Sequence, residues 1–325
     1  MAAPRPCGAA GQGVAGRRRA RPKRPARLAR VWRGRLLRLM CGAMRDAPPP
    51  PPSGLPFAKM HGLGNDFVVL DGRAGPVEVT PALARALGDR HRGVGFDQLV
   101  LVEDAQGADL SLRFWNRDGS PSAACGNATR CVARAEMDRT GRTSLLVRTE
   151  RGLLQARNEG HGLTAVNMGA PRTGWQDVPL AEDLDTLALP IAGAPVATSM
   201  GNPHCTFFVA DAGTVDLAAF GPAHERHPLF PERTNVQVAE VLAPDRLRVR
   251  VWERGAGITL ASGSSSCAAV VAAVRRGLLG GRAATVVLDG GELRVEWAED
   301  GVWMTGETAH VFDGVLSAAL LEALA

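Results

Sequence analysis

The sequence predicts an α/β protein built from two similar halves. The segment Arg113–Cys131 reads RFWNRDGSPSAACGNATRC, and the segment Arg250–Cys267 reads RVWERGAGITLASGSSSC. Their tryptophans, Trp115 and Trp252, are 137 positions apart. Each segment begins with alternating apolar residues, continues through a glycine-containing turn and leads into an apolar helix-like stretch. The same strand, turn and helix in the same order indicate a duplicated α/β unit.

Other polar residues repeat at the same spacing of 137 positions. Gly64-Asn65 precedes a β-rich apolar run, and so does Gly201-Asn202. Four polar side chains of the first half match one each in the second: Asn65 with Asn202, Gln98 with Asn235, Asn116 with Glu253, and Cys125 with Ser262. These matched pairs favour a duplication of the whole domain over two unrelated domains with similar turns.

Local patterns place these residues on elements of secondary structure. Leu110–Trp115 and Leu247–Trp252 alternate as half-buried strands do. The stretches Cys131–Met137 and Cys267–Gly277 are helix-like, and the second closes with Arg-Arg-Gly, a helix C-terminal signature.

The segments Cys125–Asn127 and Ser262–Ser264 therefore fall just before helix N-termini. Backbone N–H groups and the positive end of the helix dipole form an anion site there, which suits a carboxylate. We expect the same field to lower the pKa of a thiol at this position. A glycine directly after the acid–base residue is expected to let a ligand approach the backbone closely.

The constellation predicts a pocket between the halves in which one acid–base group from each half flanks a single carbon. A two-base racemase needs this arrangement, because one group removes the α-proton while the other delivers a proton to the opposite face. Glu253 and Arg254 are expected to contact further charged groups, and His204 or Glu253 to tune the acid–base residues. The amide side chains expected to bind an amino-acid-like substrate are Asn65, Gln98, Asn116, Asn202 and Asn235.

Charge separates the first part of the chain from the rest. Residues 1–45 hold thirteen Lys and Arg and no acidic residue, whereas the remainder holds 25 basic and 33 acidic residues, a net charge of −8. We exclude residues 1–54 from the fold and interpret them as a disordered basic and Pro-rich extension. Alternatively, the translation start is assigned too far upstream and translation begins at Met44. A tail that binds nucleic acid or membrane is the other interpretation. The rest of the chain is acidic, so we do not expect it to bind nucleic acid. We do not expect a membrane partner either, since no apolar run approaches the ~20 residues of a membrane span.

Cysteine and glycine patterns argue against a metal, a disulfide framework and a nucleotide cofactor. The six cysteines form no C-x-x-C and no Cys/His cluster with zinc spacing, so we expect free thiols in a reducing cytoplasm. Gly93-Val94-Gly95 and Gly280-Gly281 lack the full dinucleotide and P-loop patterns.

Several motifs in order resemble the diaminopimelate epimerase family: KMHGLGNDFVVLD, GFDQ, NRDGS, ACGNATRC, MGNPHC, ERTNV and WERGAG. The resemblance runs from about Phe57 to the C-terminus. It implies a pyridoxal-independent enzyme that interconverts LL- and meso-diaminopimelate for lysine and peptidoglycan precursors, with no cofactor, usually as a homodimer. It also implies two pseudo-symmetric α/β (α+β) domains, each a curved mixed or antiparallel sheet around a central helix, with the active site in the cleft between them. We expect one half at residues 55–169 together with about 309–325, and the other at 170–308.

The resemblance also implies roles for individual residues. The catalytic positions are those of Cys125 and Ser262, and His204 and Glu253 would modulate their pKa values. The substrate-binding residues that it implies are Asn65, Gln98, Asn116, Gly126, Asn127, Asn202, Asn235, Glu253, Arg254, Gly263 and Ser264.

Ser262 departs from the family pattern, which has a second catalytic cysteine at this position. A serine hydroxyl has a pKa far above that of a thiol, and losing one general acid–base group lowers a rate by about 2–4 orders of magnitude. Three outcomes stay open. Ser262 shuttles the proton in a slow epimerase, helped by Glu253 or His204; Cys125 alone supports one-base exchange or elimination, as in a lyase or dehydratase; or the protein binds the diamino acid without catalysis.

Overall fold

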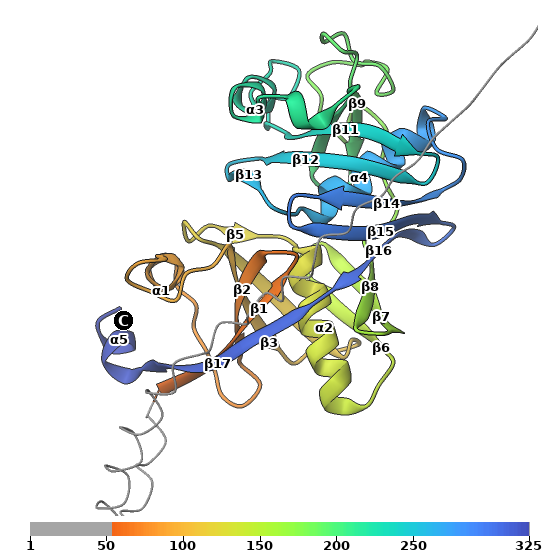
Figure 1. Cartoon of the computed structure of the whole chain (residues 1–325). Helices are drawn as coiled ribbons and strands as arrows, with labels where there is room; N and C mark the ends of the chain where they lie inside the picture. Colours follow the sequence, from red (N-terminus) through yellow and green to blue (C-terminus); the bar gives the residue numbers. More distant parts are fainter. Residues whose placement is uncertain (1–53, 325) are drawn as a thin grey trace, which may run out of the picture. The chain divides into compact units, whose positions relative to one another are not determined.

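Two curved sheets, each packed around one helix, make up the part of the chain that the computed structural model describes, residues 54–324 (Figure 1). The predicted extension lies outside the described residues, with one exception. Gly54, which we assigned to the extension, is the first residue of strand β1 because its backbone pairs with Ser317 of the last strand. This part of the prediction was wrong by one residue.

The first half runs from β1 to β8. Its helices are α1 (Pro81–Gly88) and the central α2 (Gly126–Thr140). Its strands are β1 (Gly54–Gly62), β2 (Asn65–Asp71), β3 (Gln98–Glu103), β4 (Leu110–Asn116), β5 (Pro121–Ser122), β6 (Ser144–Thr149), β7 (Gly152–Gly160) and β8 (Leu163–Asn167).

The second half repeats this order of elements. Its helices are α3 (Leu217–Glu225), which follows a short 3₁₀ turn (Ala212–Thr214), and the central α4 (Gly263–Arg275). Its strands are β9 (Val196–Ser199), β10 (Pro203–Phe208), β11 (Asn235–Ala243), β12 (Arg246–Glu253), β13 (Gly257–Thr259), β14 (Ala283–Leu288), β15 (Gly291–Ala298) and β16 (Gly301–Glu307). The structure confirms the strands predicted at Leu110–Trp115 and Leu247–Trp252. It also confirms the two predicted helices, which correspond to α2 and α4.

The two halves also share the register of their strands. Phe67 of β2 pairs in parallel with Gln98 of β3, and His204 of β10 pairs in parallel with Asn235 of β11. Each second-half residue lies 137 positions after its first-half counterpart. The antiparallel pairing of β4 with β5 recurs at the same spacing between β12 and β13. The duplication read from polar side chains is therefore also a duplication of backbone pairing.

Each central helix is almost enclosed by its own sheet. Helix α2 packs against β1, β2, β6, β7 and β8, and α4 packs against β9 to β12 and β14 to β16 (Figure 1). The inner face of α4 consists of small residues, including Ala268, Ala269, Ala272 and Ala273, all fully buried. Small side chains let the strands approach the helix closely on all sides, which fixes its direction.

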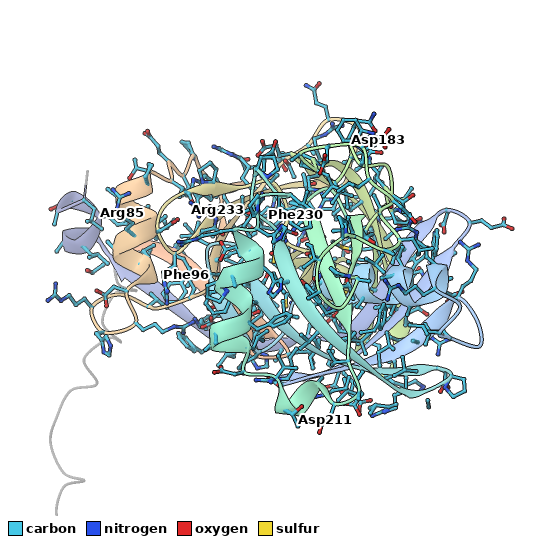
Figure 2. The ribbon with its side chains drawn as sticks, turned by 90° about the horizontal axis from the view of Figure 1, so that it is seen from above. Arg85, Phe96, Asp183, Asp211, Phe230 and Arg233 are labelled. Atoms are coloured by element: carbon cyan, nitrogen blue, oxygen red, sulfur yellow. The ribbon has the colours of Figure 1, made fainter. Side chains whose placement is uncertain are left out.

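Two smaller apolar clusters support the outer faces of the sheets. In the first half Phe96 packs with Leu83 and Leu87 of α1, and in the second half Phe230 packs with Leu217 of α3. Figure 2 shows Phe96 beside α1 and Phe230 beside α3. Helices α1 and α3 therefore occupy corresponding places in the duplicated fold.

Two strands cross between the halves. Strand β16 pairs with β15 of the second half and with β8 of the first, so the two sheets are joined along β8 and β16. The chain then returns to the first half in β17 (Ala309–Ser317), which lies antiparallel to β1 and leads into the short helix α5 (Ala318–Glu322) (Figure 1). Within residues 54–324, the model contains no helix of the length and hydropathy that crossing a bilayer requires.

Candidate active site

The N-termini of α2 and α4 open into one cavity of about 320 Å³. Residues of both halves line it, and every substrate-binding and catalytic residue that the sequence analysis proposes lies in its wall. These lining residues are Asn65, Gln98, Asn116, Cys125, Gly126, Asn127, Asn202, Asn235, Glu253, Arg254, Ser262, Gly263 and Ser264. His204, proposed to tune the acid–base residues, does not line the cavity.

Cys125 and Ser262 are the N-cap residues of the two central helices, as their positions in the sequence predict. The Cys125 Sγ accepts a hydrogen bond of 3.4 Å from the backbone N–H of Ala128 and so caps α2. The Ser262 side chain does not cap α4. Its hydroxyl donates instead to Glu253 Oε2, 3.0 Å away. The two equivalent residues therefore differ in chemistry and also in hydrogen bonding.

Gly126 and Gly263 directly follow the two N-cap residues. Methionine side chains of the protein occupy the space that a Cβ at either position would need. A Cβ on Gly126 would lie 2.8 Å from the Met168 Sδ, and a Cβ on Gly263 would lie 2.7 Å from the Met304 Sδ. Met304 approaches both glycines. We expected these glycines to let a ligand approach the backbone. Both line the cavity, and they also leave room for the methionine side chains between the two helix ends.

Glu253 is held by two hydroxyl groups. Besides the Ser262 hydroxyl, the Thr259 hydroxyl donates to Glu253 Oε1 at 2.6 Å. Burial raises the pKa of the Glu253 carboxyl, and both hydrogen bonds act in the opposite direction because they favour the carboxylate. A carboxyl group with a raised pKa, in hydrogen-bond contact with the Ser262 hydroxyl in the cavity wall, is suited to exchange a proton with Ser262.

The expected lowering of the thiol pKa at the helix N-terminus was wrong for Cys125. Burial raises its pKa to about 12, and the hydrogen bond from the Ala128 N–H offsets only part of this. The nearby Glu253 carboxylate raises the pKa further, since a second negative charge is unfavourable there. The raised pKa therefore favours the thiol over the thiolate, and the thiol is the form that carries a proton to give.

Two amides hold the start of the central helices in an equivalent way. The Asn127 amide donates to Asn65 Oδ1 at 3.1 Å. At the matching positions of the second half, the Asn202 amide approaches the Ser264 Oγ at 3.5 Å. The Asn65 amide also donates to Asp97 Oδ2 at 2.9 Å. These contacts fix the first turn of each helix relative to the neighbouring strand.

The remaining amides are partly used within the protein. The Gln98 amide donates to Asn116 Oδ1 at 2.9 Å across β3 and β4. Asn235 is nearly fully buried; its amide donates to the Pro203 carbonyl, and its Oδ1 accepts the backbone N–H of Arg254. Asn235 thus links the backbone of Pro203 to the backbone of Arg254, a contact that the sequence did not reveal.

His204 is buried, and its ring nitrogens contact neither of the two acid–base residues. Its Nε2 lies 3.0 Å from Asn202 Oδ1, and the Gln237 amide lies 2.6 Å from its Nδ1. Burial, with smaller contributions from Arg151 and Arg254, lowers the pKa of His204 to about 3. A neutral imidazole that contacts neither Cys125 nor Ser262 does not tune them directly, so the structure does not support the direct role expected from the sequence.

The sequence analysis missed three residues of the site. Asp97 lines the cavity within the GFDQ motif, and Arg151 lines it from the turn between β6 and β7. Thr259 holds Glu253 from β13. Asp97 and Thr259 lay inside motifs quoted from the sequence, GFDQ and RVWERGAGITLASGSSSC, whereas Arg151 lay in none of them.

Two further absences concern the described residues. Cys267 is the cysteine nearest to Ser262 in the sequence. It is fully buried and does not line the cavity, so it does not take the place of a second catalytic thiol. Within residues 54–324, no group of three or more His, Cys, Asp or Glu is placed to hold a metal ion.

The pKa of His204 predicts how the stability of the fold depends on pH. The unfolded imidazole titrates near 6.5 and the folded one near 3, so between these values the unfolded state binds more protons. The free energy of unfolding should therefore fall as the pH drops below 6.5, by about 2 kcal/mol between pH 7 and pH 5 from this group alone. Urea denaturation at both pH values should show a smaller fall in His204→Gln than in the wild type. His161→Gln, at an exposed position, serves as the control. Equal falls in His204→Gln and the wild type would rule out this role of His204.

Comparisons with known proteins identify the family and agree with this fold. The family model for diaminopimelate epimerase matches residues 57–174 and 196–311. The diaminopimelate epimerase of Rhodospirillum centenum is 56% identical over 272 residues, covering 82% of this chain and 93% of its own. That of Acidiphilium cryptum is 55% identical over 271 residues, covering 82% and 98%.

Solved structures share the fold at low sequence identity. A hydroxyproline epimerase from Agrobacterium vitis, with bound trans-4-hydroxy-L-proline, superposes with a TM-score of 0.60 at 15% identity, covering 81% of this chain and 90% of its own. A PhzF-family phenazine biosynthesis protein from Bacillus anthracis gives a TM-score of 0.58 at 15% identity, covering 81% and 98%. On the extent of the family match and the identity to curated relatives, the chain belongs to the diaminopimelate epimerase family.

Proposed function

We propose that this protein interconverts LL- and meso-diaminopimelate by proton transfer at the α-carbon, without a pyridoxal cofactor. Family membership supports the substrate, and the placement of Cys125 and Ser262 at the two helix N-termini around one cavity supports the reaction. The observation that carries the proposal is the hydrogen bond from Ser262 to Glu253, since it gives the second side of the cavity an acid–base group despite the missing thiol.

The substrate carboxylate on the reacting carbon is expected to bind at the helix N-termini. The backbone N–H groups of Gly126, Asn127, Gly263 and Ser264 are the donors that the cavity offers there. They satisfy the carboxylate and stabilise the negative charge that develops next to it when the α-proton leaves.

Proton transfer can then proceed from one side to the other. Ser262 Oγ takes the α-proton while its own hydroxyl proton moves to Glu253 Oε2, leaving a carbanion at the α-carbon. The Cys125 thiol gives its proton to the opposite face, which inverts the centre and leaves a thiolate and a protonated Glu253. Proton exchange with solvent, or the reverse reaction, restores both groups. A hydroxyl relay to a carboxylate is slower than a thiol, so we expect an active but slow epimerase.

We place this activity in lysine and peptidoglycan precursor synthesis in the cytoplasm. The four cysteines of the described residues are all free thiols, as a reducing compartment requires. We also propose that the chain works as two halves, residues 54–169 with 309–324 and residues 170–308; the pairing of β17 with β1 supports this division.

Purified protein incubated with LL-diaminopimelate in heavy water should yield meso product that carries deuterium at the inverted carbon, measured by NMR and chiral chromatography. Deuterium exchange without inversion would instead indicate one-base chemistry with Cys125. Neither exchange nor inversion, with binding retained, would indicate a protein that binds the diamino acid without catalysis.

The variant Ser262→Cys should raise kcat by about 10²–10⁴-fold, because it supplies a thiol as the second acid–base group. Ser265→Cys is the matched control. Ser265 lies in the same turn, is fully buried outside the cavity, and its hydroxyl has no partner within the described residues, so its replacement breaks no hydrogen bond. A rate unchanged in Ser262→Cys would show that residue 262 is not the second acid–base group.

We propose that the protein is a homodimer formed through β17. Val311, Phe312 and Val315 of this strand are 40–53% exposed, next to an apolar groove lined by Phe57 and Met60 of β1. Covering such a strip removes apolar surface from water. Sedimentation velocity should find a wild-type dimer and a folded monomer for Phe312→Asp, with the fold checked by circular dichroism. A wild-type monomer at micromolar concentration would contradict the proposal.

A further inference from the structure

Arg130 carries a positive charge into the interior of the first half. It lies in the second turn of α2, after the Cys125 N-cap, and it is the largest fully buried side chain among residues 54–324. Its Nη1 donates to Asn127 Oδ1 at 3.1 Å, and its Nη2 donates to the Glu307 carbonyl at 3.3 Å. Its Nε has no partner in the described part of the chain. Both acceptors are neutral amide oxygens, so the guanidinium is held in place but its charge is not neutralised.

Two glycines leave the space that this guanidinium occupies. A Cβ on Gly62 of β1 would lie 2.8 Å from Arg130 Nη2, and a Cβ on Gly306 of β16 would lie 3.4 Å from Arg130 Cζ. An apolar side chain could fill the same space without the free-energy cost of taking a charge out of water. Packing alone therefore does not account for an arginine at this position.

Thiol groups surround Arg130 in place of carboxylates. Burial lowers the pKa of its guanidinium, and the thiols of Cys131, Cys125 and Cys267 act in the opposite direction. Arginine stays protonated even when it is buried. Cys131 and Cys267 are fully buried, and of the three thiols only that of Cys125 lines the cavity. Cys125 is therefore the thiol near Arg130 that can exchange a proton with a ligand.

The duplicated fold carries this positive charge on one side only. At the spacing of 137 positions, Arg130 corresponds to Cys267, whose pKa burial raises to about 12. The first half thus places a buried cation near Cys125, whereas the second half places the buried Glu253 carboxyl next to Ser262. A cation favours a nearby anion, and a carboxylate can accept a proton. This polarity fits a transfer that leaves the negative charge on the Cys125 sulfur.

The other charged groups around Cys125 are less suited to stabilise a negative charge there. Burial raises the pKa of the Cys125 thiol most, and the Glu253 carboxylate and the Cys131 thiol raise it further. The remaining charged residues of the cavity wall are Asp97, Arg151 and Arg254. Asp97 is an anion, and the two arginines are partly or fully exposed, so water screens their charges more than that of the buried Arg130.

We propose that Arg130 is a positioning residue that stabilises the Cys125 thiolate formed during the reaction. This inference rests on the proposed function, in which the Cys125 thiol gives its proton to the α-carbon and is left as a thiolate. Arg130 itself exchanges no proton and does not line the cavity. Its charge stabilises the sulfur anion through the protein interior, and its bond to Asn127 holds the first turn of α2 in the cavity wall.

Alkylation of Cys125 by iodoacetamide tests this without substrate, because the thiolate is the reacting form. Peptide mapping by mass spectrometry distinguishes Cys125 from the other cysteines of the chain. At pH 8, Arg130→Met should lower the alkylation rate by about 5–10-fold, since the thiolate fraction falls. Arg130→Lys keeps the charge and should stay within about twofold of the wild type. Arg130→Gln is neutral but can donate to Asn127; it should lose as much as Arg130→Met and replaces that variant if circular dichroism shows it unfolded.

Arg134→Met is the matched control. Arg134 lies on the same helix, where it pairs with the exposed Asp138, so removal of its charge should leave the alkylation rate unchanged. A wild-type rate in a folded Arg130→Met or Arg130→Gln would overturn the inference. An equal loss in Arg130→Lys would also overturn it, since the shape of the side chain and not its charge would then matter. Either result leaves the proposed function standing, which fails instead if the incubation in heavy water yields neither deuterium uptake nor meso product.

Discussion

The architecture depends on two helix N-termini that are packed against one another and open into a single cavity. The first turn of any helix leaves N–H groups without partners inside the helix, and here two such turns meet. Met304 touches both Gly126 and Gly263, so neither helix can take a larger residue at this point without moving apart from the other. The sheets wrapped around α2 and α4 hold the two helices in direction, and the joined strands β8 and β16 hold the sheets together. What this arrangement offers to a ligand is a set of backbone donors aimed at one anion from two sides.

Equivalent positions in the duplicated fold have acquired different chemistry. Cys125 caps its own helix and is a thiol in the cavity wall whose pKa is raised. Ser262 gives up the cap of its helix to bond Glu253, and the equivalent of Glu253 in the first half is Asn116, which carries no charge. One side of the cavity thus holds a proton on sulfur, and the other holds a carboxyl group behind a hydroxyl. This asymmetry accounts for how a two-sided reaction can survive the exchange of one thiol for a hydroxyl.

The repeat in the sequence predicted the fold and most of the site because strand register carries side chains with it. Once Gln98 and Asn235 lie at one spacing, parallel pairing with β2 and β10 brings both to the same place in each half. The repeat could not supply residues with no equivalent in the other half, such as Arg151, which enters the cavity wall from a turn and fills the space over Gly201. The pKa of Cys125 was predicted in the wrong direction because burial, which sequence position does not reveal, outweighs the helix N-terminus. His204 lay in a motif beside Asn202, but only the structure shows that it faces the amides of Asn202 and Gln237 rather than the cavity.

If the protein is a two-sided epimerase, a single carbon must bind between Cys125 and Ser262, and a crystal structure with bound diaminopimelate tests this most directly. We expect the α-carbon to lie with Cys125 Sγ on one face and Ser262 Oγ on the other, each about 3–3.5 Å away, with the α-carboxylate at the backbone N–H groups of both helices. A bound diamino acid whose α-carbon faces only one of these two atoms, or whose α-carboxylate lies away from the helix N-termini, would rule out this arrangement.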